Sequence, residues 1–344
     1  MPAPVTQHDV ALAAGVSRST VTRALRDDPQ ISAAERARIH ALAQKLGYRP
    51  NPLVTALMTQ LRTGKPATFR GTLGYVVFGW DEAAWRANPD QRAMFEGAQN
   101  RATELGYRVE LHVHEPARMS ARRLSGLLVA RGIQGLLLPA PSRHEIDPPL
   151  LQWPKFALAT LGFRLGGPGL HFTANDHFAS TWSLLHNLEG RGYRRPGLLL
   201  DTTVESLTSF RIEGAFAAFQ SHHLAPADRL APLLAPGLAP ETVLAWARRE
   251  KPDVVIANTP APLASLRAAG VRVPAQTGFA LLRVNQHEHP GVSGMNPRSD
   301  LVGSAGVDMV TAQINRSETG MPANQRGLLV ESDWHEGATL RPRR

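Results

Sequence analysis

Apolar positions near the N-terminus recur every three or four residues and are separated by helix-ending residues. Thr6 and Asp9 resemble a capping box at the start of a first helix, which Gly15 ends. Ser17 is a good N-cap for a second helix that extends to about Leu25. Two helices joined by so short a glycine turn are typical of a helix-turn-helix.

Two further helices are predicted beyond this pair. One begins at Ser32, whose capping partner is Glu35, and ends at Gly47, which closes a three-helix core. The other follows Asn51 as N-cap, has Pro52 at its first position and is about ten residues long. Because so short a helix is marginal in water, it needs a partner.

The apolar stripe of this fourth helix, which includes Leu57, allows two interpretations. It packs on the body of the protein, or Leu57 enters a DNA minor groove as an apolar wedge beside its dimer mate. Spacing alone favours packing.

Beyond a linker rich in glycine, lysine, proline and arginine at 63–71, short apolar strands alternate with amphipathic helices. Strands are predicted at 72–78, 108–113, 133–138, 156–161, 197–200, 253–257 and 278–282, and helices at 91–105, 120–131, 181–188, 211–220 and in a segment ending at Ala269. The expected fold is a small all-α helix-turn-helix head and an α/β body of two doubly wound parallel-sheet lobes. Ligands of such folds bind at the carboxyl ends of the strands, here between the lobes. We therefore expect a DNA-binding domain at 1–49, a hinge helix and linker at 50–71, and an effector-binding and dimerisation domain at 72–344.

Composition narrows the function classes. The 344 residues include no cysteine, which excludes disulfides, thiolate metal sites and cysteine nucleophiles. We find no secretory leader and no apolar run long enough to span a membrane, so a cytoplasmic location without membrane contact is expected.

Positive charge is concentrated at the N-terminal end. Residues 1–70 hold ten Lys or Arg and four Asp or Glu, which gives +6 of the net +9. The polar side of the second predicted helix carries Arg18, Ser19, Thr22, Arg23 and Arg26. Arginine pairs with guanine edges and hydroxyls bind bases or phosphates, so this side fits a major groove. The alternative is an ordinary solvated helix face.

The segments 5–11, 14–17, 20–23 and 47–51 resemble the head and hinge signature of the LacI/GalR family of bacterial transcription regulators. The resemblance implies that Arg18, Ser19 and Arg23 face an operator and that Leu57 enters the minor groove of a site bound by a dimer. The full expected DNA-binding set is Thr6, Ser17, Arg18, Ser19, Thr20, Thr22, Arg23, Arg26, Tyr48, Asn51 and Leu57. Pro52 and Val54 depart from the hinge pattern of the family.

The body resembles the effector domain of the same family, which is similar to periplasmic sugar-binding proteins. Residues 192–197 and 211–214 carry this resemblance, with Gly303 and 337–339, and it implies that Arg211 contacts the effector. The alternative for Arg211 is a surface ion pair. The family usually has Asn-Asp where this chain has Asn258-Thr259, so a common hexose is a less expected effector. Together with residues placed near the cleft by topology, the expected effector-binding set is Trp80, Asp81, Phe210, Arg211, Asn258, Thr259 and Arg283. Trp80 is as readily explained by packing.

Enzyme and metal chemistry are not expected. The sequence contains no nucleophile elbow, phosphate-binding loop or zinc-protease motif, so we predict neither catalytic residues nor a cofactor. The clusters 221–223 and 287–289 contain histidines but lack helical i, i+4 spacing and a third ligand in view. We therefore predict no metal site, and interpret Asp176-His177 as surface or cleft-lining.

The predicted function is a homodimeric, sequence-specific DNA-binding regulator, a repressor rather than an activator. Its partners would be a pseudo-palindromic double-stranded operator and a small-molecule effector, such as a carbohydrate or related metabolite. A dimer is expected rather than a tetramer, because no leucine heptad follows the last predicted strand. Two alternatives are a solute-binding protein without a regulatory role and a sequence-independent DNA-binding protein.

Overall fold

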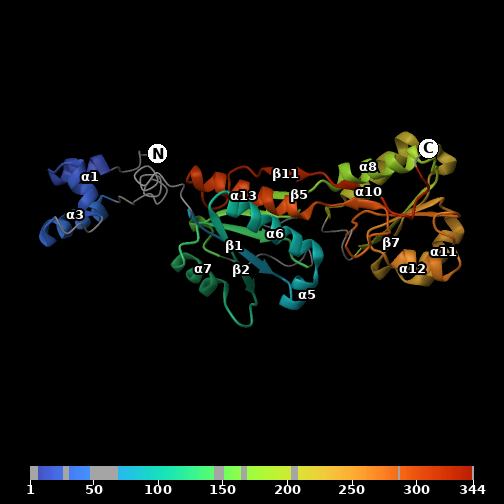
Figure 1. Cartoon of the computed structure of the whole chain (residues 1–344), viewed down its shortest axis with the longest axis horizontal. Helices are drawn as coiled ribbons and strands as arrows, with labels where there is room; N and C mark the ends of the chain where they lie inside the picture. Colours follow the sequence, from blue (N-terminus) through green and yellow to red (C-terminus); the bar gives the residue numbers. More distant parts are fainter. Residues whose placement is uncertain are drawn as a thin grey trace. The chain divides into compact units, whose positions relative to one another are not determined.

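The protein consists of two compact units, residues 1–70 and 71–344, which we describe separately. The structure is a computed structural model, and Figure 1 shows it as a cartoon. The part that it describes comprises residues 7–25, 31–46, 69–142, 151–163, 169–202, 208–285 and 287–342.

Three described helices form the first unit, and two of them are capped as the sequence predicts. They are α1 (Gln7–Ala14), α2 (Arg18–Ala24) and α3 (Ala33–Lys45). The Ser17 hydroxyl accepts from the Thr20 backbone N–H at 3.1 Å, and the Ser32 hydroxyl accepts from that of Glu35 at 3.3 Å. Gly15 has a φ of +66°, a conformation that costs glycine little and that ends α1.

Helix α3 joins the other two helices of the head. Val10, Val21 and Ile39, one from each helix, are fully buried in a common core. Arg38 donates to the Ala14 carbonyl at 2.9 Å, and the His40 ring lies 3.1 Å from the Ala24 carbonyl. Since carbonyls at a helix end have no partner within the helix, α3 stabilises the ends of both α1 and α2.

The second unit consists of two α/β lobes (Figure 1). The described sheet of the first lobe has the order β11-β5-β4-β3-β1-β2, with all neighbours parallel. The elements of this lobe are β1 (Gly71–Phe78), α5 (Glu82–Ala87), α6 (Pro89–Glu104), β2 (Tyr107–His114), α7 (Ala121–Ala130), β3 (Gly135–Pro139), a 3-10 turn (Trp153–Lys155), β4 (Ala157–Leu161), β5 (His171–Asn175), α13 (Ser299–Asn315) and β11 (Gly327–Val330).

The second lobe repeats this plan with the order β12-β10-β9-β8-β6-β7, in which only the β10–β12 pair of the described strands is antiparallel. Helices α8 and α10 cover one face of the sheet, and α11 and α12 cover the other. Its elements are α8 (His177–Gly190), β6 (Pro196–Asp201), α10 (Arg211–His223), β7 (Leu233–Ala235), α11 (Pro240–Glu250), β8 (Val254–Ala257), α12 (Ala261–Ala268), β9 (Gly278–Leu281), β10 (Gly294–Asn296), β12 (Asp333–His335) and 3-10 turns at Pro226–Asp228 and Pro236–Leu238.

Helices α6 and α13 of the first lobe pack backbone to backbone. A Cβ atom added to Gly303 would overlap the Met94 carbonyl oxygen and lie 2.8 Å from the carbonyl carbon of the same residue. A Cβ on Gly97 would overlap the Asp300 carbonyl oxygen. Glycine is therefore required on both helices for this close approach.

The predicted fold class is confirmed, and the structure adds elements that the sequence pattern did not predict. Those elements are α5, β5, β7, α11, β10, α13, β11 and β12. The predicted helix at 181–188 is longer, because α8 begins at His177 behind the cap Asp176, whose carboxylate accepts from the Ala179 N–H at 3.0 Å. The predicted hinge helix lies outside the described residues.

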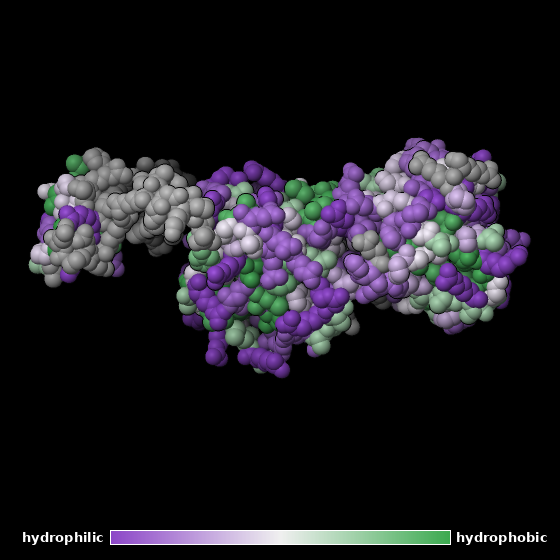
Figure 2. Space-filling view, in the orientation of Figure 1, coloured by the Kyte–Doolittle hydropathy of each residue, from purple (hydrophilic) through white to green (hydrophobic). Residues whose placement is uncertain are grey.

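The lobe surfaces are mainly polar. Figure 2 shows hydrophilic side chains over most of the visible face of both lobes, with hydrophobic side chains gathered in smaller areas. No described helix combines the length and the apolar character that a membrane span requires.

Candidate functional site

The chain passes between the two lobes three times, and one side chain joins the three passages. They follow β5, β10 and β11. The Asn175 side-chain nitrogen, at the end of β5, lies 2.9 Å from the Pro297 carbonyl, 3.0 Å from the Val330 carbonyl and 2.9 Å from the Ser332 hydroxyl. The Ser180 hydroxyl bonds that of Ser332 at 2.9 Å. Asn175 therefore ties the three interlobe passages to one another.

A cavity of about 200 Å³ lies beside this junction and is lined by residues of both lobes. Trp80 and Phe163 contribute aromatic rings from the first lobe, and Thr208 and Arg283 contribute polar groups from the second. The Trp80 indole N–H donates to the Ala140 carbonyl at 3.0 Å, which fixes its ring. Apolar rings with a few polar groups are typical of a site for a small ligand.

Arg211, the first residue of α10, has an unused donor beside this cavity. Its guanidinium carbon lies 4.3 Å from the centre of the Phe163 ring, a cation–π contact. The Arg211 Nε atom is buried and has no hydrogen-bond partner among the described residues. Since a buried N–H without an acceptor is unfavourable, a ligand oxygen would stabilise this arrangement.

The ring of His177, which also lines the cavity, is neutral. Burial first, and then the charges of Arg283 and Arg211, lower the pKa of His177 to about 3. A neutral imidazole offers a ligand one donor and one acceptor.

An ion pair in the wall of the cavity joins the two lobes. Arg283, just after β9, donates to the Asp90 carboxylate of α6 at 2.5 Å. The Ser299 hydroxyl donates to the other oxygen of Asp90 at 3.2 Å. Because Asp90 belongs to the first lobe and Arg283 to the second, opening the lobes would separate this pair.

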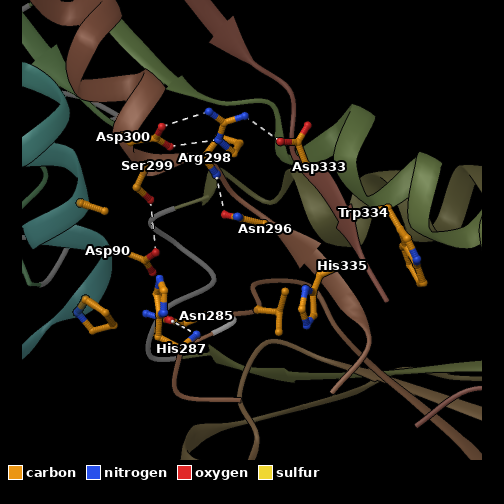
Figure 3. Close-up of a pocket in the computed structure, with 13 residues that line it drawn as sticks. Asp90, Asn285, His287, Asn296, Arg298, Ser299, Asp300, Asp333, Trp334 and His335 are labelled. Atoms are coloured by element: carbon orange, nitrogen blue, oxygen red, sulfur yellow. Dashed lines mark hydrogen bonds and ion pairs between the residues drawn. The ribbon is translucent and has the colours of Figure 1, made fainter. Parts of the chain in front are cut away.

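Asp90 and Ser299 also line a second, larger cavity of about 570 Å³ between the lobes (Figure 3). Here Arg298 binds Asp300 at 3.0 Å and Asp333 at 2.7 Å, and its backbone N–H donates to Asn296. Arg298 thereby links the start of α13 in one lobe to β12 in the other.

The structure brings together part of the expected effector-binding set. Trp80 and Arg283 line the smaller cavity, and Arg211 contacts Phe163, which lines it. Asp81 instead caps α5 by accepting from the Ala84 N–H at 3.0 Å.

The remaining members of that set lie elsewhere. Asn258 bonds the backbone of Asp201, with its oxygen 2.9 Å from the N–H and its nitrogen 3.1 Å from the carbonyl, so it joins the ends of β8 and β6. Thr259 follows it and, like Phe210, does not line the smaller cavity. The Phe210 side chain is 54% exposed.

The expected DNA-binding residues are described only in part. The Ser17 hydroxyl lies 2.8 Å from that of Thr20, and Arg23 is partly buried on α2. Arg18, Ser19 and Thr22 belong to the same helix, but their side chains lie outside the described structure. Thr6, Arg26, Tyr48, Asn51 and Leu57 lie outside the described residues altogether.

Sequence reasoning missed several residues of the cleft, among them Phe163, Asn175, Asp90 and Ser299. Phe163 follows a predicted strand and could have been found by the topological rule that placed Trp80. Asn175 ends a strand that was not predicted, while Asp90 and Ser299 lie at the starts of helices, where capping is the simpler explanation.

Comparison with known proteins gives matches over both units. The sequence-family model described as bacterial regulatory proteins, lacI family, matches residues 6–51. HTH-type transcriptional regulator MalR of Streptococcus pneumoniae is 24% identical over 221 residues, which is 64% of each chain and so less than two thirds of MalR. HTH-type transcriptional regulator CelR of Thermobifida fusca is 26% identical over 324 residues, 90% of this chain and 92% of CelR.

A solved structure of a CelR–cellobiose complex has the same fold, with a TM-score of 0.58 and 21% identity, over 97% of this chain and 99% of the other. The head of this chain therefore matches the lacI family of bacterial regulatory proteins, and the chain as a whole is similar to CelR in sequence and shares its two-lobed fold.

Proposed function

We propose that this protein is a transcription repressor that binds a pseudo-palindromic operator as a homodimer and releases or retains it according to an effector in the inter-lobe cleft. The observation that carries the proposal is the α1–α2 helix pair, with Ser17 capping α2 and a core shared with α3, on a chain whose first 70 residues hold +6 of the net charge of +9. A helix-turn-helix dimer reads two half-sites about one DNA turn apart.

Helix α2 is the proposed recognition helix. Val21 and Ala24 are fully buried against the rest of the head, which fixes the inward side of α2. Arg18, Ser19 and Arg23 are the proposed base-reading residues, because they fall elsewhere around the helix. Leu57 is the proposed minor-groove wedge. Thr6, Ser17, Thr20, Thr22, Arg26, Tyr48 and Asn51 complete the proposed DNA-binding set.

The effector is proposed to occupy the smaller cavity, against the rings of Trp80 and Phe163. Arg211 Nε, which lacks a described partner, would donate to an effector oxygen. A carbohydrate or related metabolite fits this combination of an aromatic face and polar groups. CelR, whose fold this chain shares, was solved with cellobiose.

Control of DNA binding is proposed to act through lobe closure. The Arg283–Asp90 ion pair and the Asn175 junction both span the lobes, so a ligand that contacts both sides changes the equilibrium between open and closed forms. The size of the effect on operator affinity can only equal the differential affinity of the effector for the two forms.

The test is selection of the purified full-length protein against random duplex DNA, followed by sequencing. We expect enrichment of an inverted repeat. Arg18→Ala should lose discrimination at one position of each half-site, about 5- to 150-fold for roughly 1–3 kcal/mol. Arg122→Ala, on an exposed helix face of the first lobe, is the matched control and should select the same repeat.

Two other outcomes would overturn the proposal. Weak, salt-sensitive binding to all sequences alike would identify a sequence-independent DNA-binding protein. Ligand binding without any DNA affinity, in the presence or absence of the ligand, would identify a solute-binding protein.

A further inference from the structure

Three potential metal ligands meet on the surface of the second lobe, away from the inter-lobe cleft. His186 and Glu189 lie near the end of α8, and His223 is the last residue of α10. His186 Nδ1 is 3.2 Å from Glu189 Oε2, and His223 Nδ1 is 3.9 Å from Glu189 Oε1. One ligand atom from each residue lies within 4.8 Å of the other two.

These separations are close to those of a zinc site. Zinc–nitrogen and zinc–oxygen bonds of about 2.0–2.2 Å at tetrahedral angles place neighbouring ligand atoms about 3.4 Å apart. The distance between His186 and Glu189 is already in this range, and a small movement of the half-exposed Glu189 carboxylate would bring it into range of His223 Nδ1 as well.

Aromatic neighbours hold the two imidazole rings in place. The His223 ring stacks on Phe219 with centroids 4.6 Å apart and planes at 7°. Trp182 contacts both rings by its edge or face, at 5.5 Å from His186 and 5.4 Å from His223. Since Phe219 is 1% exposed and belongs to the core of the lobe, the rings have a rigid support. Such support around the ligands lowers the entropy lost when an ion binds.

We propose that His186, Glu189 and His223 bind a divalent transition-metal cation of the zinc class. Two imidazoles and one carboxylate are a donor set that zinc accepts, and they leave a fourth position for water. Glu189 supplies a negative charge between the two neutral donors. The ion would join α8 to α10 at their ends, two helices that lie side by side on the second lobe (Figure 1).

The sequence alone does not indicate this site. His186 and Glu189 are three residues apart on one helix, and His223 is on a different helix. Only the tertiary structure therefore shows that His223 lies near the other two. The pair His222-His223 lacks a third ligand within its own segment, and the structure provides one from α8.

The matched variants are His223→Ala and His222→Ala. Both residues are exposed neighbours near the end of α10, but only His223 belongs to the cluster. Untagged full-length protein is treated with chelator and then titrated with Zn²⁺ by calorimetry. We expect one Zn²⁺ per chain in the wild type and in His222→Ala, and at least about a tenfold loss of affinity in His223→Ala. Glu189→Gln should show a similar loss.

Two further readouts separate metal binding from general effects. Co²⁺ in place of Zn²⁺ should give a tetrahedral visible spectrum in the wild type and in His222→Ala, and lose it in His223→Ala. Thermal unfolding without metal should be alike in all variants, which shows that each is folded. The proposal is refuted if the wild type does not bind Zn²⁺ with micromolar or tighter affinity, or if His223→Ala binds it as His222→Ala does.

Discussion

Replacement of Gly303 by alanine should destabilise the first lobe through the contact between α6 and α13. The added Cβ would overlap the Met94 carbonyl oxygen and lie 3.1 Å from the Ala98 backbone nitrogen. Non-bonded heavy atoms pack best at about 3.5–4.0 Å, so relief of the overlap with the carbonyl oxygen requires the helices to separate by about 1.5 Å. The obstacle is backbone, which no rotamer change can remove.

The magnitude follows from two opposing effects. Overpacking of this kind costs about 1–3 kcal/mol, and here the upper part of the range applies. Alanine is favoured over glycine within a helix by about 0.5–1 kcal/mol. The expected net loss is about 2 kcal/mol in the free energy of unfolding, or about 4–8 °C in Tm at the size of this unit.

Gly126 on α7 provides the control of opposite sign. It is exposed within the helix, and a Cβ there would meet nothing within 4 Å. Gly126→Ala should therefore keep the helix-forming gain alone and raise Tm by about 1–4 °C. Thermal unfolding followed by circular dichroism measures both variants. If Gly303→Ala were as stable as the wild type, α6 and α13 would not pack backbone to backbone at Gly303.

Three further predictions concern the cleft and the junction. Arg211→Ala should lower the affinity for the effector about 10- to 100-fold, because a hydrogen bond from a charged group is lost. It should leave operator selection in the absence of effector unchanged. An effector affinity in calorimetry equal to that of the wild type would contradict the role of Arg211. Asn175→Asp should be more destabilising than Asn175→Ala, although aspartate is closer to asparagine in shape, because its carboxylate would face the carbonyls of Pro297 and Val330. Urea unfolding measures the stability of both variants. If Asn175→Ala were the less stable variant, Asn175 would not be the donor to these carbonyls. His177 has a pKa of about 3 in the folded protein and about 6.5 when unfolded, so below pH 6.5 the unfolded chain binds the extra proton. The free energy of unfolding should thus fall toward pH 3 by up to about 1.4 kcal/mol per pH unit. In urea titrations at several pH values, His177→Gln should lack this component of the pH dependence. If His177→Gln had the same pH dependence as the wild type, the ring would be protonated in the folded state.

The sequence predicted the elements whose determinants are local. Ser17 and Ser32 cap helices as predicted, and Gly15 adopts the left-handed conformation that ends α1. The buried strands β1 and β8 were also predicted, since continuous apolar runs are typical of parallel sheets.

Elements that depend on distant contacts were missed. Helix α13 contains Gly303 and Gly306, which lower helix propensity but permit contact with α6 and with the sheet. The chemistry of the cleft was ambiguous for a similar reason. Asp81 and Asn258 carry oxygens that suit a ligand or a backbone N–H equally well, and only the fold shows that both bond the backbone.

The order in which the chain visits its two lobes has a consequence for how the protein is made. Helix α13 and strand β11 complete the first lobe, yet they are translated only after most of the second lobe. At about 5–20 residues per second, the roughly 120 residues between β5 and α13 take about 6–25 s to synthesise. During that time the side of α6 that contains Gly97 has no helix against it on the ribosome. The nascent first lobe is therefore a candidate for chaperone binding, whereas the described head is translated in full within the first 46 residues.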